Sequence, residues 1–338
     1  MRNAASRPPE ERGLPRDGVR LLAATPDGLA HAAFGDIGHF LRAGDLLVVN
    51  TSATIAAAVD GSRGDGQLVT AHFSTPLDDG TWLIELRLNS AEHERVLDAY
   101  SGETIALPSG ASLTLLHRFP EAGSDRLWAA SVTTDSAVDS YLARYGRPIR
   151  YSYVPDPWPL TAYQSVFSRD PGSAEMPSAG RPFTGDLVAR LIAAGVMFAP
   201  ITLHAGVASL EAHEAPLPER FTVPEPTATL VNLAKSRGNR VVAVGTTVTR
   251  AIESAADESG TVRAADGWTD LVLGTDRPAR VVDGLITGWH DPEASHLALL
   301  QAVAGSELVS TAYAEAESAG YLWHEFGDSA VLLPPTHR

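Results

Sequence analysis

The sequence predicts an α/β fold class, in which an α/β domain with a mixed sheet carries an inserted antiparallel β-barrel. Two observations lead to this prediction. Strand-like and helix-like segments alternate over the second half of the chain, as they do in α/β domains. Ahead of that half, between about residues 59 and 142, short strand-like runs follow one another with turn residues between them, which is typical of a small barrel or sandwich.

The first fifty residues contribute a hairpin and a buried strand. Arg20–Ala24 and Leu29–Phe34 flank a Pro- and Gly-containing tetrapeptide, which favours a turn. Asp45–Asn50 reads DLLVVN, an apolar run that ends in a polar residue and is typical of a buried strand. Because this strand resembles those of the second half, we expect the barrel to interrupt a single sheet. The predicted domains are an α/β domain of residues 1–58 and 156–338 and an inserted barrel domain of residues 59–155.

The barrel region has four strand-like runs separated by turn residues. Two stretches in it, Ser90–Ala99 and Ser136–Tyr145, favour a helix instead. The segment Tyr145–Pro159 is rich in proline and aromatic residues, which suits an extended crossing between the domains. The predicted barrel strands are Gln67–Phe73, Trp82–Leu88, Leu113–His117 and Leu127–Thr133.

The second half alternates between strands and helices, and glycines close two of the helices. The predicted helices are Asp186–Ala194, Pro226–Arg237, Thr247–Ala256, Ser295–Ala304 and Glu307–Ala319. The predicted strands are Val196–Leu203, Arg240–Val244, Leu271–Leu273, Arg280–Val282 and Ala330–Leu333.

Composition narrows the functional classes. The 338 residues include no cysteine, which excludes disulfides, a thiolate nucleophile and cysteine-ligated metals. The longest apolar runs are strand-sized and the first twenty residues have no apolar core, so we expect a cytoplasmic protein without a membrane partner. The net charge of −15 does not attract phosphate backbones over the whole surface, although a local basic patch could bind RNA.

Three familiar signatures are missing from the sequence: a P-loop, a dinucleotide-binding glycine turn and a His-Glu-x-x-His zinc motif. Four histidines, His204, His213, His290 and His296, could be imagined as a metal cluster. No two of these histidines have the spacing of metal ligands on one face of a helix, with a third ligand near them. We therefore expect them to be separate hydrogen-bonding residues, and we expect no metal.

Two segments place small or polar residues where ligands bind in α/β proteins. The loop of residues 171–184 is dense in Gly, Ser and Ala and leads into a helix, so its N–H groups can approach a ligand; a plain surface loop is the alternative. Ser178, Gly180 and Thr184 are its candidates. His204, in the sequence TLHAG, follows a strand at the edge where such sites form, as a base, a donor or a strand-end cap.

Two further segments add acids, hydroxyls and imidazoles. Gly245, Thr246 and Thr247 join a strand to a helix start, where they bind a ligand or simply cap the helix. Arg250, one turn later, binds an anion or forms a surface ion pair. Singly, each of these segments is also typical of a solvated loop, but together they put polar groups at several strand ends. The remaining candidates are Asp283 and His290, with an aromatic residue between them, and Asp328, close to His324 and Glu325.

With these motifs in this order, the chain resembles the S-adenosylmethionine:tRNA ribosyltransferase-isomerases of queuosine synthesis. The resemblance covers residues 163–333 and, more weakly, residues 41–51. The matching stretches are YQSVF, PGS followed by PSAG and FT, TLHAG, VVAVGTT, TDL, VVDGLIT and FGD.

The resemblance implies an α/β domain with an inserted β-barrel and a reaction with S-adenosylmethionine as the ribosyl donor. Members of the family attach the rearranged ribosyl ring to 7-aminomethyl-7-deazaguanine in a tRNA anticodon, and adenine and methionine leave. A base removes a C5′ proton that the sulfonium acidifies, and polar groups stabilise the departing adenine. The expected partners are S-adenosylmethionine and tRNA, and the expected assembly is a monomer or a weak homo-oligomer.

Carried over to this sequence, the resemblance suggests roles for the candidates. His204 and Asp283, with His290, are the candidate catalytic acid, base or orienting groups. No metal is implied. The residues expected to bind S-adenosylmethionine are Ser178, Gly180, Thr184, Gly245, Thr246, Thr247, Arg250 and Asp328.

The chain departs from the family pattern in places where side chains would contact the acceptor. The family reads Thr-Ala-Gly-Leu-His-Phe-Thr where this chain has residues 178–184 with Arg181-Pro182, and Asn-Asp-Thr-Arg where it has Asn50-Thr51-Ser52-Ala53. It reads Asn-Phe-His-Leu-Pro at Gly288–Pro292. Lost Arg and His side chains are of the type that contacts RNA phosphate or bases. Two alternatives follow: the same donor chemistry on a small nucleoside or metabolite, or a non-catalytic nucleoside-binding protein.

Overall fold

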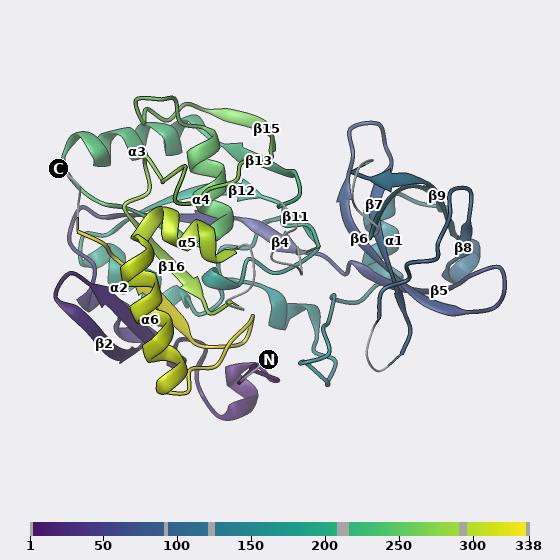
Figure 1. Cartoon of the computed structure of the whole chain (residues 1–338), viewed down its shortest axis with the longest axis horizontal. Coiled ribbons are helices and arrows are strands. Elements are labelled where there is room, and N and C mark those ends of the chain that lie inside the picture. Colours follow the sequence, from purple (N-terminus) through teal and green to yellow (C-terminus); the bar gives the residue numbers. More distant parts are fainter. Residues whose placement is uncertain (1–2, 91–93, 121–125, 208–215, 291–295, 336–338) are drawn as a thin grey trace.

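The computed structural model describes residues 3–90, 94–120, 126–207, 216–290 and 296–335. The chain folds into a large α/β body and a smaller β-barrel lobe, which stands beside the body and is joined to it by extended segments (Figure 1). The predicted fold class, a mixed-sheet α/β domain with an inserted antiparallel barrel, is confirmed.

A nine-stranded mixed sheet forms the centre of the body, in the order β15-β13-β12-β3-β14-β16-β17-β1-β2. Its four middle strands, β12, β3, β14 and β16, run parallel, so their carboxyl ends meet at one edge. The strands are β1 (Arg20–Thr25), β2 (Gly28–Ala33), β3 (Leu46–Asn50), β12 (Met197–Leu203), β13 (Glu219–Val223), β14 (Val241–Val244), β15 (Ala265–Thr269), β16 (Gly284–Gly288) and β17 (Ser329–Leu332).

Both faces of this sheet are buried, which explains the unbroken apolar run of β3. Leu46 and Val48 pack with helices α3 to α6 on one face, whereas Leu47 and Val49 pack with α2 on the other. Thr184 caps α2 by accepting a hydrogen bond from the N–H of Leu187 at 3.1 Å. The helices of the body are α2 (Gly185–Ala193), α3 (Glu225–Ser236), α4 (Thr246–Ser254), α5 (His296–Ala304) and α6 (Ser306–Ser318).

The barrel closes in the order β10-β7-β6-β5-β8-β9, with neighbouring strands antiparallel. Phe73, Leu113 and Trp128 are among its buried core residues, and α1 packs on it through Tyr141 and Leu142. The elements are β5 (Ala58–Ser62), β6 (Leu68–Pro76), β7 (Trp82–Leu88), β8 (Thr104–Ala106), β9 (Ser112–Phe119), β10 (Leu127–Thr133) and α1 (Val138–Tyr145).

A two-stranded parallel ribbon lies at the junction of body and barrel. Strand β4 (Ser52–Thr54) leaves the body, and β11 (Asp170–Ser173) returns to it beside β4. A second pairing follows where Ala58 and Arg147 exchange backbone hydrogen bonds of 2.9 Å. The domain limits at residues 58/59 and 155/156 stay a prediction.

Three predicted elements are wrong. Residues 94–99 of the predicted helix Ser90–Ala99 are not helical, because Val96 and Ala99 fill the barrel core from an extended segment; residues 91–93 lie outside the described residues. Leu271, Leu273, Val281 and Val282 are buried, but neither predicted segment, Leu271–Leu273 or Arg280–Val282, pairs as a strand, and the strand of this region is β16. None of the helices in the described ranges has the length and apolar content that crossing a bilayer requires.

Candidate active site

The carboxyl ends of the four parallel strands open into a cavity of about 900 Å³. This is the edge at which open α/β sheets bind ligands, and the volume is in the range of small-molecule sites. The body supplies the segments that follow β12, β14 and β16, and the barrel supplies Ser74, Thr75, Leu83 and Arg87. The cavity therefore lies between the two lobes.

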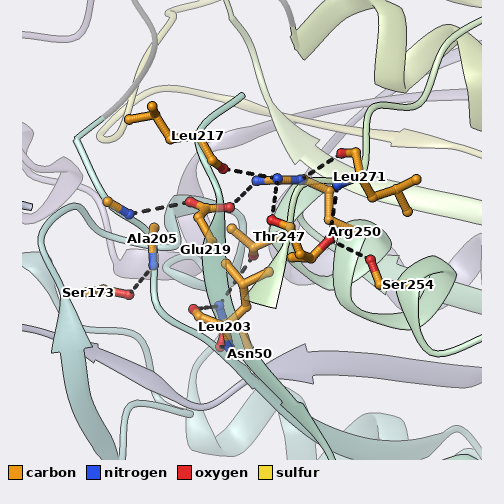
Figure 2. Close-up of polar contacts among 12 residues, drawn as sticks. Asn50, Ser173, Leu203, Ala205, Leu217, Glu219, Thr247, Arg250, Ser254 and Leu271 are labelled. Atoms are coloured by element: carbon orange, nitrogen blue, oxygen red, sulfur yellow. Dashed lines mark hydrogen bonds and ion pairs between the residues drawn. The ribbon is translucent and has the colours of Figure 1, made fainter. Parts of the chain in front are cut away.

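Asn50, the last residue of β3, holds the strand ends at this edge together. Its side chain donates to Leu203 O at 2.8 Å and accepts from the Leu203 N–H at 3.0 Å, so it clamps β3 to β12. It also donates to Thr247 Oγ1 at 3.3 Å, which ties the start of α4 to the same point. Figure 2 shows Asn50 between Leu203 and Thr247.

Arg250 of α4 and Glu219 of β13 form an ion pair in the cavity wall. Arg250 also donates to the carbonyl oxygens of Leu217, Thr269 and Leu271, each at 3.1 Å, as Figure 2 shows for Leu217 and Leu271. The Nε and both terminal nitrogens of the guanidinium are thus bonded within the protein. Arg250 is buried and pairs with Glu219, so it forms an ion pair inside the protein rather than the surface ion pair or the open anion site that the sequence suggested.

Aromatic rings and carboxylates from three segments form a second part of the wall. Tyr151 stacks on Tyr153 with ring centroids 5.9 Å apart, and Tyr153 stacks on His324 at 4.2 Å. The Tyr153 hydroxyl donates to Glu325 Oε2 at 2.7 Å, and the Tyr151 hydroxyl donates to Glu175. Burial raises the pKa of Glu325, and burial with the neighbouring carboxylates raises the pKa values of both tyrosines well above their usual range.

His290 contributes an imidazole just beyond the end of β16. Its ring lies parallel to that of His296, with centroids 4.5 Å apart and 3° between the planes. Burial, together with the neighbouring His296 and His324, holds the pKa of His290 well below its ordinary value. Burial therefore favours the neutral imidazole, and its Nε2 lies 3.4 Å from Thr287 Oγ1.

The structure brings together a majority of the residues singled out from the sequence. Thr246 and Thr247 begin α4, and Ser178, in the segment after β11, also lines the cavity. The predicted residues that line the cavity are Ser178, Gly245, Thr246, Thr247, Arg250 and His290. Asp291 and Pro292, which follow in the same motif, lie outside the described residues.

Asp283 does not reach the cavity. It precedes β16, at the amino end of the parallel strands, where it pairs with Lys235 Nζ at 2.8 Å and accepts from the Val241 N–H at 2.9 Å. The sequence interpretation treated Arg280–Val282 as the strand, which put Asp283 at a carboxyl end. Because the strand instead begins at Gly284, Asp283 lies at the opposite edge of the sheet.

His204 lies behind the cavity wall rather than on it. Its Nδ1 is 2.7 Å from Ser52 Oγ, which in turn is 2.6 Å from Ser173 Oγ, so the imidazole bridges β12 to the junction ribbon. Burial lowers the pKa of His204. Three more predicted residues do not line the cavity because backbone packing and local bonds hold them: Gly180 is buried beside Ser165, Thr184 caps α2, and Asp328 pairs with Arg20.

Charged and aromatic residues of the wall that were not selected from the sequence include Arg87, Tyr151, Tyr153, Glu175 and Glu219. Tyr151 and Tyr153 were part of the predicted crossing segment, and their spacing of two residues puts both rings on one side of an extended chain. This two-residue spacing is the sequence signal from which the pair of wall tyrosines could have been predicted. Among the described residues, no three His, Asp or Glu side chains converge as a metal site would require.

Comparison with known proteins identifies relatives over nearly the whole chain. Residues 2–332 match the model of a family described as queuosine biosynthesis protein. An S-adenosylmethionine:tRNA ribosyltransferase-isomerase of Acidiphilium cryptum is 35% identical, over 96% of each chain. The protein of the same name from Gluconacetobacter diazotrophicus is 34% identical, over 96% of this chain and 92% of its own.

A solved structure is similar to this chain over nearly its whole length. It is the S-adenosylmethionine tRNA ribosyltransferase of Thermotoga maritima, which is 27% identical and matches with a TM-score of 0.52. The match covers 98% of this chain and 96% of the other, so it spans the barrel as well as the body.

Proposed function

The chain belongs to the queuosine biosynthesis protein family, and from this membership we propose that it transfers and isomerises the ribosyl moiety of S-adenosylmethionine onto 7-aminomethyl-7-deazaguanine in tRNA. Adenine and methionine leave in this reaction, and an epoxycyclopentane forms. The observation that carries the proposal is the cavity between the lobes, at the carboxyl ends of the parallel strands, in a chain with relatives of that name along its whole length.

The segment Gly245–Thr247 is the proposed contact for the donor. Gly245 has no side chain and is the N-cap residue just before α4. The first N–H groups of the helix and the hydroxyls of Thr246 and Thr247 are therefore presented at the cavity. These groups suit the ribose hydroxyls and the carboxylate of S-adenosylmethionine. Ser178 supplies a further hydroxyl on the same wall.

The charge of the cavity also suits this donor. Its described lining has three carboxylates, Glu175, Glu219 and Glu325, against two guanidinium groups. Both guanidinium groups, Arg87 and Arg250, are paired with carboxylates of the protein. A sulfonium cation gains from such surroundings, and its charge makes the C5′ hydrogens acidic.

His290 is the proposed base, because the other two candidates, His204 and Asp283, do not line the cavity. It lines the cavity and burial favours its neutral form, so in this proposal it accepts the C5′ proton without first losing one of its own. His204 acts through Ser52 and Ser173 as a brace of the cavity wall in this proposal. With tRNA as the substrate, the protein acts in the cytoplasm.

Release of adenine tests the function directly. Purified protein is incubated with S-adenosylmethionine alone, with tRNA that carries 7-aminomethyl-7-deazaguanine, with the same tRNA lacking the modification, and with the free modified base. Adenine and methionine are measured by mass spectrometry. Adenine formed only with the modified tRNA supports the proposal, whereas adenine formed with the free base and not with tRNA assigns the enzyme to a small acceptor. Binding of S-adenosylmethionine without adenine in any mixture contradicts it and favours a nucleoside-binding protein.

A further inference from the structure

Two carboxylates of the cavity wall, Glu325 and Glu175, each accept a hydrogen bond from a tyrosine hydroxyl. We propose that Glu325 and Glu175, held by Tyr153 and Tyr151, form the subsite that binds the primary ammonium group of the acceptor, and that Glu325 takes its proton. This inference rests on the proposed function, because it names the acceptor subsite of the same cavity. For brevity, Tyr151, Tyr153, Glu175, His324 and Glu325 are called the acidic wall.

The acidic wall is chemically complementary to an ammonium group. A carboxylate accepts up to about four hydrogen bonds. The Tyr153 hydroxyl at 2.7 Å from Glu325 Oε2 therefore fixes the carboxylate and leaves capacity for the N–H groups of a ligand. Stacked aromatic rings beside carboxylates are the surroundings in which proteins bind organic ammonium groups, since ring faces and anions both attract a cation.

The acidic wall also distinguishes the acceptor from the donor. In 7-aminomethyl-7-deazaguanine the ammonium is one methylene from a flat ring, whereas in S-adenosylmethionine a ribose and a thioether chain separate the amino group from adenine. The acidic wall offers a ring stack, Tyr151–Tyr153–His324, in which the two tyrosine hydroxyls donate directly to the carboxylates. A wall that joins a stacking surface to an anion at this short range fits the acceptor, because unstacked RNA bases bind to aromatic side chains in this way.

Proton transfer follows binding of the ammonium. The ammonium must become an amine before its nitrogen can form a bond to the ribosyl carbon. In the proposed step, one N–H proton moves to the Glu325 carboxylate, which gives a neutral amine and a neutral carboxylic acid, and no other bond changes. Burial raises the pKa of Glu325 and so makes its carboxylate a better proton acceptor than an exposed one.

The experiment compares two ligands that differ in one group. Binding of tRNA with 7-aminomethyl-7-deazaguanine and of tRNA with the uncharged 7-hydroxymethyl analogue is measured by titration, with the full-length wild type and with Glu325→Gln and Glu175→Gln. Glu315→Gln on α6, outside the cavity, is the matched control. We expect the wild type and the control to prefer the amine at least tenfold. We expect the two cavity variants to lose this preference, and Glu325→Gln to lower kcat as well.

Affinity for S-adenosylmethionine, measured with the same proteins, separates the two sources of an ammonium group. Unchanged donor affinity in Glu325→Gln supports the proposal, whereas a loss equal to that for the acceptor assigns the acidic wall to the donor and overturns it. No preference for the amine in the wild type also overturns it, even if adenine is released. If the proposed function is wrong, no adenine is released. The binding comparison between the two tRNAs can still be interpreted in that case, because it does not depend on turnover.

Discussion

The guanidinium of Arg250 pairs with the carboxylate of Glu219 and at the same time donates to three backbone carbonyl oxygens, those of Leu217, Thr269 and Leu271. Arg250 is on the helix that begins at the cavity, and Glu219 begins the strand β13. Glu219 also accepts from the Gly206 N–H at 3.3 Å, beside the end of β12. One ion pair therefore holds three elements of the cavity wall in place.

Removal of either partner of this pair is expected to destabilise the protein. Arg250→Met leaves a buried carboxylate and three carbonyl groups without their donor, so we expect a loss of about 3–5 kcal/mol in the free energy of unfolding, measured by urea titration. The control is Arg263→Met, because Arg263 is exposed and its nitrogen is 3.7 Å from Asp257. A loss below about 1 kcal/mol for Arg250→Met would show that the pair has little structural importance.

Replacement of His290 is expected to reduce turnover and leave the fold intact. His290→Asn removes the proposed base, for which we expect a fall in kcat of about 10²–10⁴-fold, measured by adenine release. His39→Asn, at an exposed position, is the control. An equal fall for His204→Asn, with His290→Asn nearly as active as the wild type, would return the role of base to His204.

The acid limb of the rate profile provides a second check of His290. Because its pKa is depressed from 6.5, the imidazole stays neutral as the pH falls through 6.5, and we expect kcat to decline only at lower pH. The same depression costs stability in acid, because the unfolded chain binds a proton below pH 6.5 that the folded chain does not. A decline in kcat centred at 6.5 would contradict this assignment.

Gly245 is expected to be sensitive to a single methyl group. Its φ of 101° is one that L residues rarely adopt, and an added Cβ would lie 3.3 Å from the Ala179 Cβ. We expect Gly245→Ala to lower stability by about 1–3 kcal/mol and to weaken binding of S-adenosylmethionine in calorimetry. Gly288→Ala is the matched control, because Gly288 also lines the cavity and its added Cβ meets nothing within 4 Å. Equal effects of the two changes would refute the role of backbone conformation.

Glu85 in the barrel is expected to govern stability in acid. Burial alone would raise its pKa, but the nearby His72, Arg87 and Arg126 outweigh burial and lower it to about 2. A depressed carboxyl pKa stabilises the folded state above the unfolded value of 4.5, and this contribution of about 3 kcal/mol is lost as the pH falls from 4.5 towards 2.

Urea unfolding at a series of pH values between 2 and 6 measures the contribution of Glu85. Glu85→Gln should be less stable than the wild type at pH 6 and should lose less stability on acidification. The exposed Glu258 supplies the control, Glu258→Gln, which should follow the wild type. Parallel curves for the wild type and Glu85→Gln would mean that other carboxylates account for the acid sensitivity.

The sequence predicted the body and the barrel because their strongest patterns are local. The hairpin β1–β2, the buried strand β3 and the barrel strand β10 all have runs of apolar or alternating residues bounded by turn residues. Strand β16 was missed because glycines stand at both of its ends and only Leu285 and Ile286 are strongly apolar. Its place in the sheet comes from pairing with β14 and β17, which no local pattern records.

The site was predictable where one segment carries it and not where several segments meet. Gly245 and Thr246 were found because a strand, a glycine and a helix start follow one another. Tyr153 and Glu325 are 172 positions apart, so their hydrogen bond depends on how the two lobes are joined. The same dependence misplaced Asp283, since one shift in a strand boundary moves a side chain from one edge of a sheet to the other.

The junction ribbon has a mechanical consequence. Because the outgoing strand β4 and the returning strand β11 are hydrogen-bonded to each other, the barrel is attached to the body by a double strap rather than by a single flexible thread (Figure 1). Since the barrel supplies Ser74, Thr75, Leu83 and Arg87 to the cavity, this paired connection fixes where one side of the cavity stands relative to the other.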